Sequence, residues 1–198
     1  MLSTHLSTGV AATHTASDTG TVVAPHQASI AAGMSMYEQG GNAVDAAVSA
    51  ALVAGVIEPT ETTLLGSGFM LLQEKQQQPW SIDFGPKAPQ AASAAMFQID
   101  TEASSSAVLG LAPVVDNANV DGPLAAGVPR TLLGLLRAQE RFGTLSRQAV
   151  CAPAIQAAYD GFDADMWFLT SALHDVERLR RDPQAAKTFL DDEGLPKG

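Results

Sequence analysis

The side chains that could perform chemistry are few and widely separated along this chain. It contains four histidines: His5, His14, His26 and His174. None of them has the i, i+4 spacing of a helical zinc site, and none has a neighbouring cysteine. We therefore expect no metal site, and no cofactor is indicated. Ser67 lies within Leu65-Gly-Ser-Gly-Phe69, which lacks the register of the G-x-S-x-G hydrolase motif, so we interpret it as a turn residue.

The single cysteine and the largest arginine cluster both have a structural interpretation. Cys151 has no partner for an internal disulfide and lies among apolar residues, which favours a buried side chain over a reactive thiol. The cluster of Arg178, Arg180 and Arg181 could bind a carboxylate or a phosphate. However, the acidic residues Asp175, Glu177 and Asp182 lie beside these arginines, which is typical of a solvated helical face.

The net charge argues against two classes of partner. Twenty-one acidic and eleven basic residues give a formal charge of -10, which repels phosphate backbones and anionic lipid. Neither nucleic-acid nor membrane binding is expected. Residues 1–20 lack the basic start and apolar block of a secretory signal, so we predict a flexible leader there, one domain over 21–198, and a cytoplasmic location by default.

The segment that must position any site runs from Glu38 to Phe69. Glycines 40 and 41 predict a sharp turn, and Asn42 is a typical N-cap with Asp45 placed to complete a capping box. The following residues, 43–57, are apolar on every face of a helix, which indicates burial all round. A loop rich in Thr, Ser and Gly follows.

The remaining pattern predicts an α+β fold. We expect a strand at 21–24 and a helix from 30 to 37, then strands at 69–74 and 80–84 that form an antiparallel hairpin, the first covered on both faces. Residues 90–121 show no sustained hydrophobic periodicity, so we expect a loop or a short helix there. Helices are expected at 132–142, in two short pieces around Pro153, in one longer segment capped by Asp163, and after Asp182-Pro183.

Four sequence blocks occur in an order that resembles a known family. They are Val23-Ala-Pro-His26; Gln39-Gly-Gly-Asn-Ala-Val-Asp-Ala-Ala-Val48; Glu58-Pro59 with Gly68-Phe-Met-Leu71; and Leu124-Ala-Ala-Gly-Val-Pro129 with Arg141-Phe-Gly-Thr144 and Ala152-Pro-Ala-Ile155. From about Gly20 onward the chain resembles the N-terminal part of the large subunit of the gamma-glutamyltransferase (gamma-glutamyltranspeptidase) family.

This resemblance implies the αββα sandwich of an N-terminal-nucleophile hydrolase. In that family one precursor is cleaved into two subunits, and the threonine exposed on the small subunit attacks a γ-glutamyl amide with its own amine as base. The chain ends before the family's Thr-Thr-His region. We therefore expect an incomplete sandwich with no catalytic residue, inert alone, whose partners are the remainder of the large subunit, the small subunit and a small-molecule amide.

The chain departs from the family at two places near the expected acyl pocket. The family block Asp-Phe-Arg-Glu-x-Ala-Pro reads Asp83-Phe-Gly-Pro-Lys-Ala-Pro89 here, so Gly85 stands where an arginine binds the substrate α-carboxylate, and Lys87 is the nearest cation in the sequence. The glycine-rich loop is also altered, with Leu65 and Ser67 in place of glycines. Gly85 and Lys87 are the candidate substrate-binding positions.

Three functions remain open from these residues. Glutathione or γ-glutamyl hydrolysis is the family default. The altered pocket favours a relative that acts on a non-glutamyl amide, such as a cephalosporin side chain or oxamate. A non-catalytic truncated remnant is the alternative of another class. In each case we expect residues 69–72 to be partly uncovered and the chain to self-associate.

Overall fold

The computed structural model describes residues 13–16, 20–103 and 112–197. The strands are β1 (Thr13–Ala16), β2 (Thr21–Ala24), β3 (Gly68–Leu72) and β4 (Trp80–Phe84). The α-helices are α1 (Gln27–Glu38), α2 (Ala43–Ile57), α3 (Thr131–Phe142), α4 (Arg147–Asp160), α5 (Met166–His174), α6 (Val176–Arg181) and α7 (Pro183–Phe189). Short 3-10 helices lie at Val115–Asn117 and Pro123–Ala125. Two antiparallel two-stranded sheets, β1-β2 and β3-β4, make this a mixed α+β fold, as predicted.

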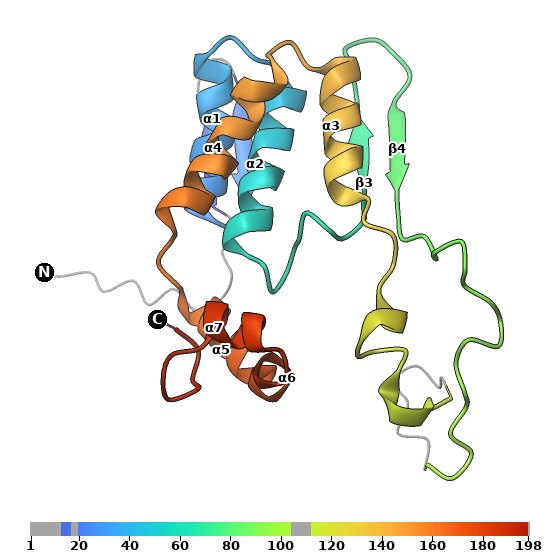
Figure 1. Ribbon diagram of the computed structural model, residues 1–198. Coiled ribbons are helices and arrows are strands. Elements are labelled where there is room, and N and C mark those ends of the chain that lie inside the picture. The colour runs from blue at the N-terminus through green and yellow to red at the C-terminus, as the bar shows by residue number, and fades with distance from the viewer. Residues whose placement is uncertain (1–12, 17–19, 104–111, 198) are drawn as a thin grey trace, which may run out of the picture.

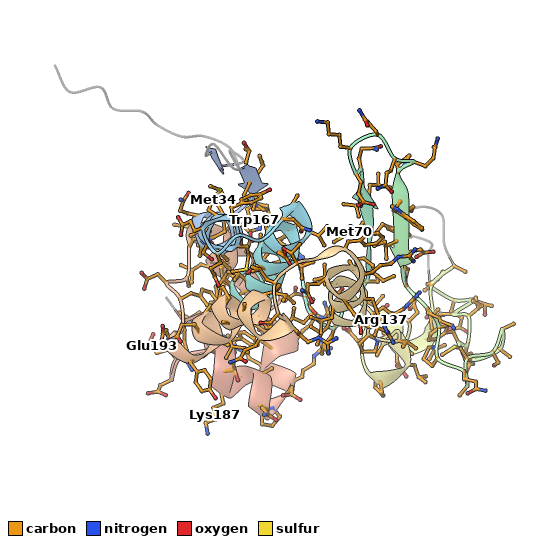
Figure 2. The ribbon with its side chains drawn as sticks, turned by 90° about the horizontal axis from the view of Figure 1, so that it is seen from above. Met34, Met70, Arg137, Trp167, Lys187 and Glu193 are labelled. Atoms are coloured by element: carbon orange, nitrogen blue, oxygen red, sulfur yellow. The ribbon has the colours of Figure 1, made fainter. Side chains whose placement is uncertain are left out.

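Helix α2 forms the centre of the molecule. Figure 1 shows α1 and α4 packed beside it, while α3 stands between α2 and the β3-β4 hairpin. Val48 and Leu52 are at most 2% exposed, so the uniformly apolar sequence of this helix is explained by neighbours on several sides. Seen from above in Figure 2, α3 again separates the helical group from the hairpin, with Arg137 on α3 and Met70 on β3.

The N-terminus of α2 has the capping box that the sequence predicts. Asn42 Oδ1 accepts hydrogen bonds from the backbone amides of Val44 at 2.9 Å and Asp45 at 3.2 Å, and Asp45 Oδ2 accepts from the Asn42 amide at 3.0 Å. The preceding turn uses Gly40 at φ +81° and Gly41, where a Cβ would lie 2.8 Å from the Met36 carbonyl oxygen. Only glycines fit this turn without strain.

The β3-β4 hairpin is confirmed, with Gly68 opposite Phe84 and Leu72 opposite Trp80. The prediction that its first strand is covered on both faces is wrong. Phe69 and Leu71 are 68% and 82% exposed, whereas Met70 packs against the core. Alternate side chains of a strand point to opposite faces, and α3 covers only one face of this hairpin within the described part of the chain.

Strand β1 lies within residues 1–20, for which the sequence predicts a flexible leader. It pairs with β2 in antiparallel register, Thr13 opposite Ala24 and Ala16 opposite Thr21, a pairing that the sequence prediction omitted. The other residues of that range, except Gly20, lie outside the described residues. The 21–24 strand itself is confirmed.

Helix α4 corrects the expectation of two pieces divided at Pro153. The helix runs without a break from Arg147 to Asp160, with Ser146 as its N-cap, as predicted. Val150 and Ala154, on either side of the proline, are both buried in the core. Packing against α2 holds the helix together although the proline has no amide proton for one helical hydrogen bond.

The next helical segment is also shorter than expected. We predicted one long helix capped by Asp163, but α5 begins at Met166 because Asp165 Oδ1 accepts from the Phe168 amide at 2.7 Å. Asp175 then ends α5 and starts α6. The start of α7 at Asp182-Pro183 is confirmed by a 2.7 Å bond from the Ala185 amide to Asp182 Oδ1. Among the described helices, none is both long and apolar enough to cross a bilayer.

Candidate functional site

The two candidate positions follow directly on β4 and lie beside the start of α3. Gly85 is buried, and its amide donates to Asp83 Oδ1 at 2.7 Å. Lys87 is exposed, and its carbonyl oxygen accepts from the Val128 amide at 2.9 Å. Residues 85–87 therefore run alongside residues 128–130, so the structure brings Gly85 and Lys87 to one edge of the hairpin.

The space around Gly85 is closed to a larger side chain in this arrangement. A Cβ at this position would lie 2.8 Å from Phe69 Cζ and 2.9 Å from Asp83 Oδ1. An arginine here would have to displace both side chains. The absence of a side chain at residue 85 thus leaves room for the exposed Phe69 ring to lie against the Gly85 backbone.

Arg130 is the residue that sequence reasoning missed. Its Nη1 donates to the Gly85 carbonyl at 2.9 Å and its Nη2 donates to the Asp83 carbonyl at 3.3 Å. The sequence did carry one indication: Arg130 directly precedes a predicted helix, where a positive charge interacts unfavourably with the helix dipole and needs another reason to be there. Nothing in the sequence, however, showed that this guanidinium reaches across to the end of β4.

The altered loop before β3 packs against the same end of α3. The carbonyl oxygen of Gly66 accepts from the amides of Arg130 at 2.8 Å and Thr131 at 3.0 Å, and that of Leu64 accepts from the Leu132 amide at 3.2 Å. Leu64 also packs against the core. The loop therefore satisfies the free amides of the first turn of α3, a task that a side-chain cap usually performs.

An open cavity of about 620 Å³ lies between α2, β2, β3 and the first turns of α3. Its wall includes Ala47, Ala51, Ser67, Phe69, Thr131 and Leu135. Glu58 also borders it, and burial raises the pKa of this carboxyl, with Asp165 and Glu61 acting in the same sense and His26 opposing them. Oε2 of Glu58 is buried and has no hydrogen-bond partner among the described residues.

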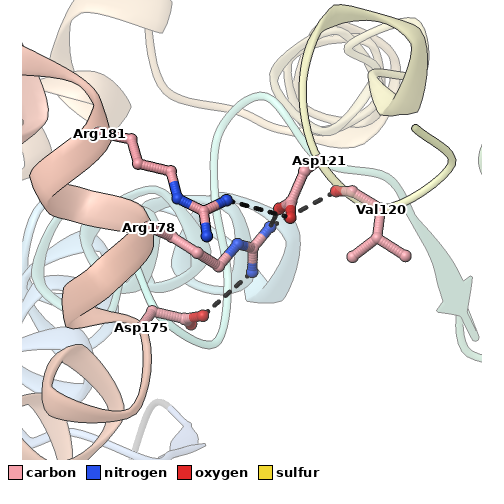
Figure 3. Close-up of polar contacts among 5 residues, drawn as sticks. All are labelled: Val120, Asp121, Asp175, Arg178 and Arg181. Atoms are coloured by element: carbon pink, nitrogen blue, oxygen red, sulfur yellow. Dashed lines mark hydrogen bonds and ion pairs between the residues drawn. The ribbon is translucent and has the colours of Figure 1, made fainter. Parts of the chain in front are cut away.

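The arginine cluster of α6 is occupied by acids of the chain itself. Figure 3 shows Arg178 between Asp121 and Asp175, with N···O distances of 2.7 Å and 3.0 Å. Arg181 lies 3.8 Å from Asp121. These partly exposed ion pairs connect α6 with the loop before α3, and the cluster does not form a separate anion site.

The other sequence candidates show no catalytic grouping in the described residues. Burial raises the pKa of the Cys151 thiol and outweighs the opposing charge of Arg147, so the thiol is protonated at neutral pH. His26 Nδ1 accepts from the Ala28 amide as the N-cap of α1, and His174 ends α5. His5 lies outside the described residues. The described part of the chain contains no cluster of three or more potential metal ligands.

Comparison with known proteins places this fold and site in context. The family profile described as gamma-glutamyltranspeptidase matches residues 29–198. The chain belongs to the gamma-glutamyltranspeptidase family. The gamma-glutamyltranspeptidase of Helicobacter pylori aligns with a TM-score of 0.80 and 28% identity over 92% of this chain and 49% of the solved one. The resemblance and the N-terminal-nucleophile hydrolase fold predicted from the sequence blocks are thereby confirmed.

Curated relatives within the family carry two kinds of name. A glutathione hydrolase proenzyme of Pseudomonas sp. (strain A14) is 33% identical over 189 residues, which are 91% of this chain and 31% of the relative. The acylase ACY 1 proenzyme of Pseudomonas sp. (strain SE83) is 34% identical over 171 residues, 86% of this chain and 30% of the relative. The chain thus spans about a third of the length of these relatives.

Proposed function

We propose that this chain is the N-terminal part of the large subunit of an amide hydrolase or acyltransferase, with γ-glutamyl amides such as glutathione as the default substrates. The observation that carries the proposal is the family match over residues 29–198, supported by the relatives named glutathione hydrolase. A cytoplasmic location and partners limited to the rest of the precursor and a small amide belong to the same proposal.

In this proposal the chain supplies the scaffold and one wall of the acyl pocket, and it supplies no nucleophile. The attacking threonine and its amine would come from the small subunit, which arises from the same precursor. Leu64 of the loop lies against Gly55 of α2, and the loop carbonyls in turn bind the first amides of α3. The isolated chain is therefore expected to be inactive.

The acylase alternative has a specific observation in its favour. Residue 85 has no side chain, and Phe69 and Asp83 occupy the space where one would begin. A pocket without an arginine at this position would accept acyl groups other than γ-glutamyl. The similarity to the acylase ACY 1 proenzyme points in the same direction.

The first experiment is to express the gene with its downstream sequence and to weigh the purified product by mass spectrometry. Two subunits whose masses sum to one precursor would support the enzyme. A single stable product of about 20.5 kDa would contradict it and favour a non-catalytic remnant.

The second experiment compares substrates on the processed enzyme. Faster hydrolysis of γ-glutamyl-p-nitroanilide than of a cephalosporin side-chain amide would support the default function. The reverse order would support the acylase alternative. Loss of both activities on mutation of the first residue of the small subunit to Ala would confirm the N-terminal nucleophile.

A further inference from the structure

A second cavity, of about 570 Å³, lies where α5, α6 and α7 meet the loop that follows α2. In Figure 1 these three helices form a group below the C-terminal end of α2. The loop contributes Glu61 to the wall, and the helices contribute three aromatic side chains, Trp167, Phe168 and Phe189, with Asp175 at the end of α5. A cavity of this size is typical of sites that hold a small molecule.

The aromatic side chains of this cavity are held in place by the surrounding structure. Trp167 Nε1 donates to Glu61 Oε1 at 2.9 Å, which also ties α5 to the loop after α2. The Phe168 ring is 8% exposed and lies edge-on to Phe162, with a centroid distance of 5.8 Å, and tilted against Phe189, at 6.4 Å. The walls are thus formed before a ligand arrives, which lowers the conformational entropy lost on binding.

The charged side chains of the wall are acidic. Among the described residues that line the cavity there is no lysine or arginine. Glu61 forms no ion pair with a basic side chain of the described residues, and Asp175 shares Arg178 with Asp121. The faces of aromatic rings attract cations, as carboxylates do. A cation with an apolar body therefore matches both properties of this cavity, whereas the carboxylates would repel an anion.

We propose that this cavity binds a small primary ammonium ion that carries an aryl or alkyl group. The rings of Trp167, Phe168 and Phe189 would surround the apolar body, and the ammonium would donate to Glu61. Oε2 of Glu61 is available for this bond, because it accepts no hydrogen bond from the described residues. The inference goes beyond the proposed function and does not depend on it, since it requires neither a nucleophile nor a processed precursor.

The test uses Trp167 as a fluorescent reporter. The chain contains two tryptophans, so Trp80→Phe leaves only this one and keeps an aromatic ring at position 80. Titration with phenethylammonium should change the emission of Trp167 in a saturable way. The neutral analogue 2-phenylethanol should need about tenfold higher concentration or more, because it has no charge to pair with Glu61. The anion 3-phenylpropanoate should bind more weakly still.

Glu61→Gln, made in the Trp80→Phe chain, removes the charge and keeps an oxygen that can accept from Trp167 Nε1. It should weaken phenethylammonium binding about tenfold or more and leave 2-phenylethanol binding unchanged. The matched control is Glu177→Gln, the same change of charge on α6 at a residue that does not line the cavity, which should bind like the parent chain. Phe189→Leu keeps apolar bulk without a ring face. It should weaken binding of the ammonium more than of the alcohol, and it serves as the test variant if Glu61→Gln melts early.

Three results would overturn the inference. The first is equal affinity for the ammonium and the alcohol, or no saturable change at all. The second is unchanged ammonium affinity in Glu61→Gln, or an equal loss in Glu177→Gln. The third is loss of binding, measured by calorimetry, in the product of the gene expressed with its downstream sequence, because the rest of the precursor would then occupy the cavity. An unprocessed product that binds the ammonium through Glu61 would support this site and refute the enzyme alone.

Discussion

Asp45 is a fully buried carboxylate that joins two distant parts of the chain. Its Oδ2 accepts from the Thr144 amide and the Thr144 hydroxyl, both at 2.9 Å, in addition to the Asn42 amide. Burial opposes ionisation, but the hydrogen bonds from Asn42, Thr144 and Gln139 outweigh it and hold the pKa of Asp45 below its ordinary value of 3.8. The charged form is therefore the one that the fold stabilises.

Asp45→Asn should destabilise the fold by about 2–4 kcal/mol at neutral pH, because the amide group cannot accept all of these hydrogen bonds. Urea denaturation measures the effect, and Asp163→Asn, at an exposed position, is the control. A depressed folded-state pKa contributes stability above the unfolded value, which is lost as the pH falls through the folded one. The difference between parent and variant should thus shrink below about pH 4. A constant difference would refute this explanation.

The pKa of Glu58 is shifted in the opposite direction to that of Asp45. Its raised pKa means that the folded state favours the protonated form, so its contribution to stability is greatest below pH 4.5 and is lost as the pH rises through the folded-state pKa. Glu58→Gln is expected to raise the melting temperature at pH 7 and to leave it unchanged near pH 4. The same substitution at exposed Glu193 should have no effect at either pH. A lower melting temperature at pH 7 would refute the prediction.

At the scale of elements, α3 holds β4 at both ends. Trp80 packs on Phe142 with ring centroids 5.6 Å apart, and the Arg141 guanidinium lies 4.2 Å from the centre of the Trp80 ring. At the other end, a Cβ on Gly134 would overlap the side chain of Phe84. The helix can approach the strand this closely only because residue 134 is glycine.

Gly134→Ala should therefore destabilise the chain by about 1–3 kcal/mol through overpacking, although alanine is the better helix former. Thermal unfolding measures the change. Gly127→Ala is the control, because a Cβ at residue 127 would meet only the Lys87 carbonyl oxygen, at 3.5 Å. A stabilised Gly134→Ala variant would show that the contact between α3 and β4 is looser than described.

Local signals predicted most of the elements, and tertiary packing explains the failures. The capping box at Asn42, the hairpin and the Asp182-Pro183 start depend on near neighbours in sequence, and all are confirmed. The continuity of α4 through Pro153 depends on contacts with the core, which no local pattern reveals. The site shows the same limit. Gly85 and Lys87 were visible as departures from a motif, but Arg130, 45 residues after Gly85, enters only through folding.

At the scale of the whole molecule, the outer face of the hairpin exposes large apolar side chains. Phe69 and Leu71 point away from the core, and Leu65, just before the strand, is 72% exposed. Large exposed apolar side chains that gather on one face often mark a contact with another protein surface. Self-association of the isolated chain through this face stays a prediction from the sequence, and the structure identifies which side chains to change.

The double variant Phe69→Thr, Leu71→Thr should raise the dissociation constant of self-association about tenfold or more, because threonine preserves strand propensity and removes apolar area. Sedimentation velocity over a range of concentrations measures it. Val23→Thr, an exposed residue of the other sheet, should leave association unchanged. A parent chain that stays monomeric and monodisperse at every concentration would contradict the prediction.

The bond between Asp45 and Thr144 also bears on the order in which the chain can fold during synthesis. The two residues are 99 positions apart, which corresponds to roughly 5–20 s of translation. Helices α1 and α2 leave the ribosome long before the partners of the Asp45 carboxylate. Until residues 139–145 emerge, the Asp45 carboxylate has only the Asn42 amide of its own capping box as a partner, and the apolar surface of α2 has neither α3 nor α4 to cover it.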